Sequence, residues 1–195
     1  MTVRQFDNLL ANHCAPALAG IKSANLISVQ KNAGENLDDL LRVYNRSLNM
    51  TGIRMEILCR YSTHTLVLVY QPDLLWRELM LPENKQFLMN SGYSEWYSLS
   101  TVLYSLKERC RAQCVPHEIG LFLSYPLEDV IGFIENRQDC KLTGYWKVYS
   151  DVPSAQKRFH QFTLCKDDVC RRVQNGDSIL RLFQYQRIPE YPELI

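Results

Sequence analysis

Apolar residues recur every three or four positions along much of the chain, a spacing that puts them on one face of a helix. A capping-box pattern, Thr2 followed by Gln5, opens the first such segment, which Pro16 interrupts. The helices predicted in this way cover residues 2–16, 37–48, 72–93 with a break at Pro82, 99–110, 127–134, 151–173 and 179–183. Each has an apolar stripe that needs a packing partner.

Shorter runs rich in β-branched and aromatic residues predict about five strands. They lie at residues 25–29, 54–60, 65–70, 117–124 and 144–149, and the fourth is expected to turn directly into the helix that follows Pro126. The second and third runs are separated by a stretch too short for a helical crossover, so these strands form an antiparallel hairpin. The pattern predicts a single α/β domain over residues 1–195, with one mixed sheet covered by helices.

Composition and charge narrow the classes of function. Lys and Arg number 22 against 21 Asp and Glu, a net charge of +1, which leaves no excess of positive charge for a phosphate backbone. The longest apolar runs are strand-sized, and the N-terminus carries polar residues inside its apolar positions, unlike a secretory signal. We therefore expect a cytoplasmic protein with neither nucleic acid nor membrane as partner, whose seven cysteines stay thiols.

Two segments carry a family resemblance. The stretch HEIGLFLSYPLEDVIGFIEN, followed by GYWKVYSD, is similar to a bacterial family catalogued as domain-of-unknown-function family 3793. The similarity extends to HCAPALAGIKSANL, where that family has a similar His-Cys-x-Pro-x-Leu-Ala-Gly-x-Lys stretch, so it spans nearly the whole chain. The resemblance implies a small cytoplasmic protein and no established reaction, cofactor or catalytic residue. The chain departs from the family pattern at Ser124, where the family usually has Gly before Tyr-Pro.

Residue types that bind ligands gather at two places. His117 and Glu118 open the predicted fourth strand and Tyr125 follows its end, where α/β proteins often bind ligands. On the GYWKVY strand, Tyr145 and Lys147 share one face and could stack on a flat ring and contact an anion. A polar strand end and a solvated sheet face would give the same pattern, so both interpretations stand. The full candidate set is His13, Lys22, His117, Glu118, Tyr125, Tyr145 and Lys147.

Two adjacent carboxylates, Glu128 and Asp129, fall in the first turn of the helix after Pro126. Their interaction with the helix dipole explains them without catalysis. A catalytic pair would need environments that separate the two pKa values, which the sequence does not show.

The cysteines offer a metal site as an alternative. Cys110, Cys114 and His117 have a C-x3-C-x2-H spacing, and Cys140 could supply a fourth ligand. The same cysteines lie on or beside an apolar stripe, where free Cys commonly behaves as a small buried hydrophobe. A nucleophilic couple would have to form across the fold, for example Cys14 with His117.

No dinucleotide fingerprint, phosphate loop, H-E-x-x-H or G-x-S-x-G motif occurs in the sequence. The pattern favours a cytoplasmic accessory protein that binds a small ligand or a partner protein. The alternative is a thiol- or metal-dependent enzyme, redox- or iron-linked, that uses cysteines with His117. A third reading, a structural interaction domain, predicts an exposed apolar patch. The sequence identifies neither a cofactor nor an oligomeric state.

Overall fold

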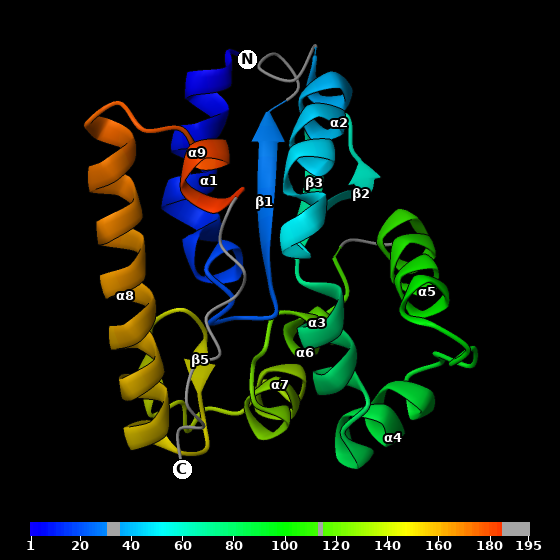
Figure 1. Ribbon diagram of the computed structural model, residues 1–195. Helices are drawn as coiled ribbons and strands as arrows, with labels where there is room; N and C mark the ends of the chain where they lie inside the picture. The colour runs from blue at the N-terminus through cyan, green and yellow to red at the C-terminus, as the bar shows by residue number, and fades with distance from the viewer. Residues whose placement is uncertain (31–35, 113–114, 185–195) are drawn as a thin grey trace.

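A three-stranded antiparallel sheet forms the centre of the protein (Figure 1). The computed structural model describes residues 1–30, 36–112 and 115–184. The sheet has the order β1-β3-β2, and a separate two-stranded hairpin joins β4 to β5. The strands are β1 (Ala24–Gln30), β2 (Arg54–Arg60), β3 (His64–Tyr70), β4 (Leu142–Thr143) and β5 (Lys147–Val148). The helices are α1 (Val3–Leu18), α2 (Leu37–Leu48), the 3-10 helix η2 (Asn49–Thr51), α3 (Pro72–Leu79), α4 (Pro82–Asn90), α5 (Leu99–Ala112), α6 (Ile119–Phe122), α7 (Leu127–Ile134), α8 (Val152–Gln174) and α9 (Ile179–Phe183).

The central strand β3 is buried on both faces. Successive side chains of β3 point to opposite faces of the sheet. Val67 and Val69 therefore lie in one hydrophobic core, and Leu66 and Leu68 lie in another. β3 pairs antiparallel with β1 on one side and with β2 on the other, which confirms the hairpin predicted between residues 54–60 and 65–70. A strand covered on both faces is continuously apolar, as TLVLVY is.

Helices cover both faces of the sheet (Figure 1). α1, α2, α9 and the C-terminal half of α8 pack on one face, while α3 to α7 pack on the other. A third, smaller core joins the β4–β5 hairpin to the N-terminal half of α8 through Trp146, Val148, Ala155 and Phe162. The predicted helices at 37–48, 72–93, 99–110, 127–134, 151–173 and 179–183 are confirmed, including the break at Pro82.

The first helix runs further than predicted. The Thr2 capping box is present, with the Thr2 side chain accepting from the Gln5 N–H, but the helix continues through Pro16 to Leu18. The Pro16 carbonyl then accepts the N–H groups of Ile21 and Lys22 at 3.0 and 3.2 Å. These bonds satisfy a carbonyl at the helix end and place Lys22 directly beneath the last turn.

The prediction of one mixed sheet of about five strands is wrong. Among the described residues three strands form the sheet, all antiparallel, and the other two form a separate short hairpin. The segment at 117–124 is not a strand but contains the single helical turn α6. Its apolar residues are buried in the second core, and a short continuous apolar run is compatible with either conformation.

The segment at 144–149 is a strand only over Lys147–Val148. Gly144 makes the turn instead, because its N–H donates to the Trp146 carbonyl at 3.0 Å. A Cβ at Gly144 would overlap the Phe159 ring, so glycine lets this turn lie directly against α8. The alternation expected for a six-residue strand is lost as a result.

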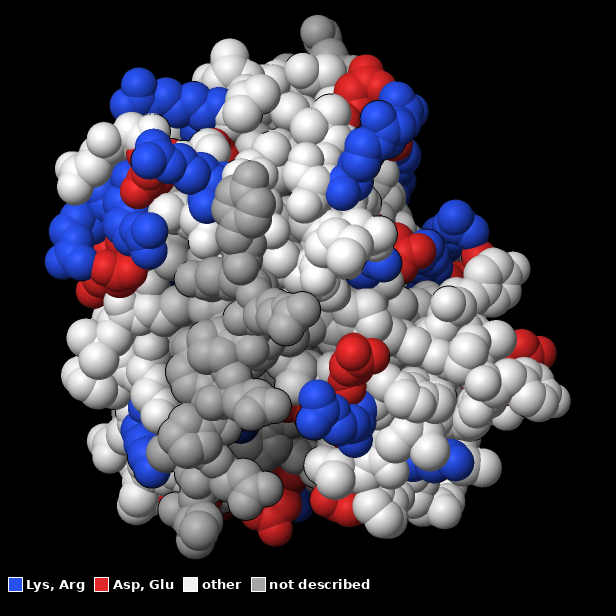
Figure 2. Space-filling model, in the orientation of Figure 1, with Lys and Arg blue, Asp and Glu red and all other residues white. Residues whose placement is uncertain are grey.

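Charged side chains of both signs lie close together on the surface (Figure 2). At the α8–α9 end, Asp177 lies 3.7 Å from Arg172 and 3.4 Å from Arg181, and Asp168 pairs with Arg171. Such exposed pairs add little to stability, but they cancel charge locally. On the face that Figure 2 shows, Lys and Arg therefore lie next to Asp and Glu.

No helix of the described residues is both long enough and apolar enough to span a bilayer.

A buried acid ties α1 to α2 and α9. The Tyr44 hydroxyl donates to Asp7 Oδ1 at 2.5 Å, and the backbone of Ile179 also donates to this carboxyl. Burial raises the pKa of Asp7 above its ordinary value of 3.8, more than these two bonds lower it.

We expect this acid to make stability fall as pH rises. A carboxyl whose pKa is raised in the folded state stabilises the fold below its unfolded pKa, and that contribution is lost as pH rises through the folded pKa. Asp7→Asn keeps one acceptor oxygen for Tyr44 and Ile179 but cannot ionise. Urea unfolding from the ordinary pKa of Asp toward neutrality should show a shallower loss of stability in Asp7→Asn than in wild type. Parallel curves would contradict the assignment.

Candidate functional site

A cleft opens between α6, α7 and the β4–β5 hairpin, and we call it the aromatic cleft. It encloses about 410 Å³, within the range of small-molecule sites. Its rim carries His117, Phe133 and Lys147, which are all exposed. The residues that line it are Val115, Pro116, His117, Ile119, Gly120, Tyr125, Asp129, Val130, Phe133, Thr143, Gly144, Trp146 and Lys147.

The turn between α6 and α7 presents Tyr125 to this cleft. Ser124 has φ +58°, a left-handed conformation that favours glycine, which accounts for the glycine of the family pattern at this position. Three contacts hold the serine there: its Oγ accepts the Ser23 N–H at 3.0 Å and lies 2.5 Å from Ser23 Oγ, and its carbonyl accepts from Arg158 at 2.7 Å. These bonds fix the turn against β1 and α8.

Asp129 holds the hairpin wall in place. One carboxylate oxygen accepts the Trp146 indole N–H at 2.7 Å, and the other accepts the backbone N–H groups of Tyr149 and Ser150, both at 2.8 Å. Asp129 is buried, whereas its neighbour Glu128 is exposed. The two carboxylates therefore do not act on one reacting atom, and the Asp129 charge is used to position Trp146.

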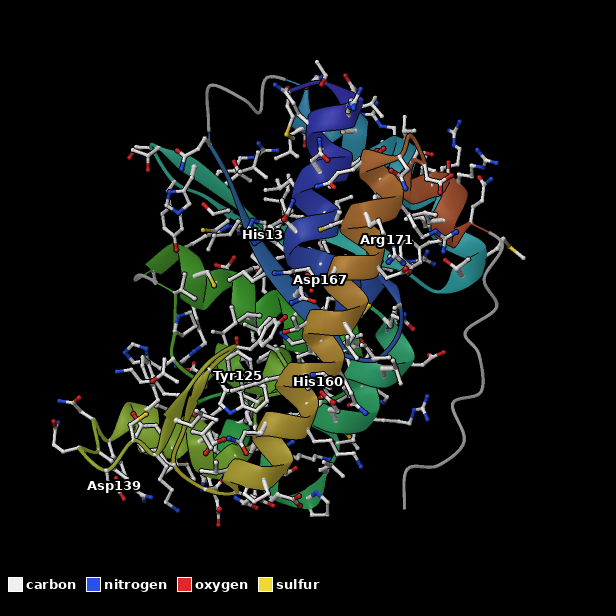
Figure 3. All side chains as sticks on the ribbon, turned by 90° about the vertical axis from the view of Figure 1, so that its left-hand side faces the viewer. His13, Tyr125, Asp139, His160, Asp167 and Arg171 are labelled. Atoms are coloured by element: carbon white, nitrogen blue, oxygen red, sulfur yellow. The ribbon has the colours of Figure 1, made fainter. Side chains whose placement is uncertain are left out.

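Aromatic rings form the inner wall. Tyr125 stacks on Trp146 with ring centroids 5.1 Å apart and planes 28° apart, and Phe159 meets Trp146 edge-on at 4.5 Å. Figure 3 shows Tyr125 beside the β4–β5 hairpin. Offset and edge-to-face packing of this kind keeps the rings in fixed orientations. The wall is therefore rigid and apolar before any ligand arrives.

The rim adds charge and a titratable group. Lys147 Nζ lies 5.6 Å from the centroid of the Phe133 ring, and His117 packs edge-on against the same ring at 5.1 Å. Within the described part of the chain Lys147 has no carboxylate partner within ion-pair distance. The aromatic cleft thus combines an apolar interior with an unpaired cation at its mouth.

Glu118, adjacent to His117 in sequence, does not reach the cleft. It is buried on the other side of α6, where Oε1 accepts from Arg109 Nε at 2.6 Å and from the Tyr93 hydroxyl at 3.3 Å. Glu118 therefore connects α6 to α5 and to the chain after α4.

Tyr145 and His13 belong to a second hollow, between α1 and α8. These helices pack side by side, and Figure 3 shows His13 on α1. The hollow encloses about 510 Å³ and is lined by Gln5, Asn8, Leu9, Asn12, His13, Tyr145 and Lys166. Tyr145 lies in the turn of the hairpin, whereas Lys147 begins β5, so the shared face expected for a regular strand does not form.

Lys22 lies in neither hollow. It is only 4% exposed, and Nζ sits 5.2 Å from the centroid of the Tyr125 ring and 5.7 Å from that of Phe162. Burial lowers the pKa of Lys22 to about 8. The structure thus places Lys22 behind the aromatic wall.

The predicted metal ligands are not gathered among the described residues. No group of three His, Cys, Asp or Glu side chains there could hold a metal ion, and Cys114 lies outside the described residues. Cys110 is buried in the second core, where burial raises its thiol pKa to about 11. Cys140 is half-buried, with Sγ 3.4 Å from the Leu142 carbonyl oxygen. Cys14 is fully buried, and burial raises its pKa as well. A nucleophilic thiolate needs a lowered pKa.

Two aromatic residues of the site were not among the candidates from the sequence. Trp146 packs in the third core and also lines the cleft. Phe133, 41% exposed, forms part of the rim. An exposed large aromatic side chain at the end of an otherwise apolar helix face was the available signal for Phe133.

Comparison with known proteins identifies a family. Residues 10–183 match the family model described as protein of unknown function, DUF3793, the family that the sequence motifs resemble. No curated protein and no solved structure matches the chain.

Proposed function

The chain belongs to the family described as protein of unknown function, DUF3793, and because that description assigns no reaction, we propose a function from the aromatic cleft. The protein binds a small ligand that has a flat apolar ring system and a negatively charged group. The observation that carries this proposal is the combination of a rigid aromatic wall with an unpaired Lys147 at the mouth of the same cavity.

Each part of the ligand has a matching part of the cleft. The apolar body fits between the Tyr125–Trp146 wall and Val130, where burial of apolar surface stabilises the complex. The charged group remains at the rim, where the Lys147 ammonium and the His117 imidazole can donate hydrogen bonds to it. The Phe133 ring between these two groups offers a further stacking surface.

Two further points belong to this proposal. We infer a cytoplasmic setting, supported by the free thiols of Cys14, Cys59, Cys110, Cys140, Cys165 and Cys170. We also infer one domain over residues 1–195, supported by α8, which contributes to both the first and the third core.

Anilinonaphthalene sulfonate, a flat apolar anion that fluoresces on burial, tests the proposal. We expect it to bind the folded protein, and Lys147→Met to weaken binding about tenfold, since a charge-assisted contact contributes about 1.5 kcal/mol or more. Thr143→Trp should weaken it further, because Thr143 lines the cleft and is exposed, so the larger ring can fill the cavity. Fluorescence titration measures both affinities.

Lys166→Met is the matched control, because Lys166 lines the second hollow and not the aromatic cleft. Its affinity for the dye should equal that of wild type. Far-UV circular dichroism must show each variant folded, since the dye also binds partly unfolded chains. Equal affinities in wild type, Lys147→Met and Thr143→Trp would overturn the proposal, and so would a loss confined to Lys166→Met.

A further inference from the structure

A third hollow lies at the end of the molecule where Figure 1 shows α3, α4 and α7 close together. It encloses about 290 Å³, close to the lower end of the range for small-molecule sites. Glu78, Glu83 and Asn84 line it from α3 and α4, and Arg158 lines it from α8. Tyr125 forms part of the wall here as well as in the aromatic cleft. The hollow therefore brings together carboxylates and a guanidinium from segments far apart in the chain.

The opposite charges of this hollow do not pair with each other. In the described part of the chain, no carboxylate oxygen of Glu78 or Glu83 lies within 4.0 Å of an Arg158 nitrogen. Burial lowers the pKa of Arg158, and Glu78 acts in the opposite direction, so the two charges are within electrostatic reach. A molecule with one charge of each sign could therefore bridge them.

Three of the lining side chains keep hydrogen-bonding groups without a partner among the described residues. Asn84 is only 9% exposed, and its Nδ2 donates to the Glu78 carbonyl at 2.8 Å, which leaves Oδ1 unpaired but not fully enclosed. Glu78 Oε2 accepts from the Ser23 hydroxyl at 2.7 Å, which leaves Oε1. Arg158 uses one of its five N–H groups for the Ser124 carbonyl. A largely buried oxygen such as Asn84 Oδ1 costs free energy unless water or a ligand donates to it.

These groups match a zwitterion better than a simple ion. The ammonium group of such a molecule can donate to Glu78 Oε1 and Asn84 Oδ1, while its carboxylate accepts from Arg158. A simple anion would be repelled by Glu78 and Glu83, and a simple cation by Arg158. Three leucine side chains also line the hollow, namely Leu81, Leu121 and Leu127. They suit an apolar side chain, whose burial favours binding.

We propose that this hollow binds a free α-amino acid with an apolar side chain. Glu78 and Asn84 hold its ammonium group, and Arg158 holds its carboxylate. Cation–π contacts with Trp146 and Phe162, at 5.1 and 5.8 Å, keep the Arg158 guanidinium in place before the amino acid arrives. The site goes beyond the ligand proposed for the aromatic cleft and does not depend on it.

L-leucine is the probe, and thermal unfolding and calorimetric titration are the measurements. Wild type should gain thermal stability with L-leucine, because a ligand that binds the folded state stabilises it. Isocaproate lacks the ammonium group and L-leucinamide lacks the carboxylate, so each should bind at least about tenfold more weakly than L-leucine. No stabilisation by L-leucine, or equal affinities for the three compounds, would overturn the proposal.

Glu78→Gln removes the charge but keeps the shape of the side chain and an acceptor for Ser23. It should remain folded and bind L-leucine at least about tenfold more weakly than wild type. Glu128→Gln is the matched control, because Glu128 is exposed and does not line this hollow. Unchanged L-leucine affinity in Glu78→Gln contradicts the proposal. So does an equally large loss for isocaproate, since Glu78 would then not act on the ammonium group. Lys147→Met should bind L-leucine as wild type does, so the dye experiment is unaffected by either result.

Discussion

Asp129→Ala is expected to lower the free energy of unfolding by about 4 kcal/mol. The substitution removes the acceptor for the Trp146 indole and for the N–H groups of Tyr149 and Ser150. A hydrogen bond to a charged group contributes about 1.5–3 kcal/mol, and water entering the vacated space recovers part of the sum. Urea unfolding gives the change, and near-UV circular dichroism reports whether Trp146 keeps its fixed environment.

Glu128→Ala is the matched control, because Glu128 precedes Asp129 on α7 but is exposed. Its free energy of unfolding should stay within about 0.5 kcal/mol of wild type. Asp129→Asn should fall between the two, since an amide has one acceptor oxygen for three donors. Equal stabilities of Asp129→Ala and Glu128→Ala would show that the hairpin is held by packing alone. Asp129→Ala should also abolish dye binding, because Asp129 positions Trp146, which forms the wall of the aromatic cleft.

The hairpin within the central sheet was predictable because its signals are local. TLVLVY is apolar at nearly every position, as a strand covered on both faces must be, and a short polar turn links it to its partner. The helices were predictable for the same reason, since caps, stripes and breaks such as Pro82 lie within the segments they determine. Periodicity failed in the segment predicted as a strand at residues 117–124, because residues 118–124 are all buried and a continuously buried run does not distinguish strand from helix.

Part of the candidate site could also be predicted from the sequence. His117, Tyr125 and Lys147 do share the aromatic cleft, because the α6–α7 turn and the hairpin after Gly144 face each other. Glu118 and Tyr145 lie outside the aromatic cleft. Glu118 pairs with Arg109, and Tyr145 lines the second hollow. The directions of the Glu118 and Tyr145 side chains follow from a helical turn and a hairpin turn. The strands predicted at these two places implied different side-chain directions.

The contacts of Ser124 could not be predicted from the sequence. Ser124 was noted only as a departure from the family pattern, and Arg158 was not among the candidate residues. Ser23 and Arg158 both bind Ser124, whose left-handed backbone brings the α6–α7 turn between β1 and α8. That contact joins three segments far apart in the chain. No periodic pattern within one segment carries such information.

Glu118→Ala is expected to lower the free energy of unfolding by about 3 kcal/mol. The substitution leaves the buried Tyr93 hydroxyl and the Arg109 guanidinium without their acceptor. Breaking a buried ion pair costs about 3–5 kcal/mol, and the lower end applies because the Arg109 side chain is 39% exposed and can be solvated. Urea unfolding measures the loss. Glu108→Ala is the control, because its pair with Arg111 is exposed on both sides and should change stability by less than about 0.5 kcal/mol.

Two further variants decide whether Glu118 stabilises the fold or contacts a ligand. Its position next to His117 in the sequence leaves both roles open. Glu118→Gln keeps the shape and part of the hydrogen bonding, so the protein should remain folded at moderate temperature. Its dye affinity should then equal that of wild type, because Glu118 faces Arg109 and Tyr93 rather than the aromatic cleft. His117→Ala, on the rim, should weaken dye binding with little effect on stability. A loss of dye affinity in folded Glu118→Gln, with His117→Ala unchanged, would reverse these two roles.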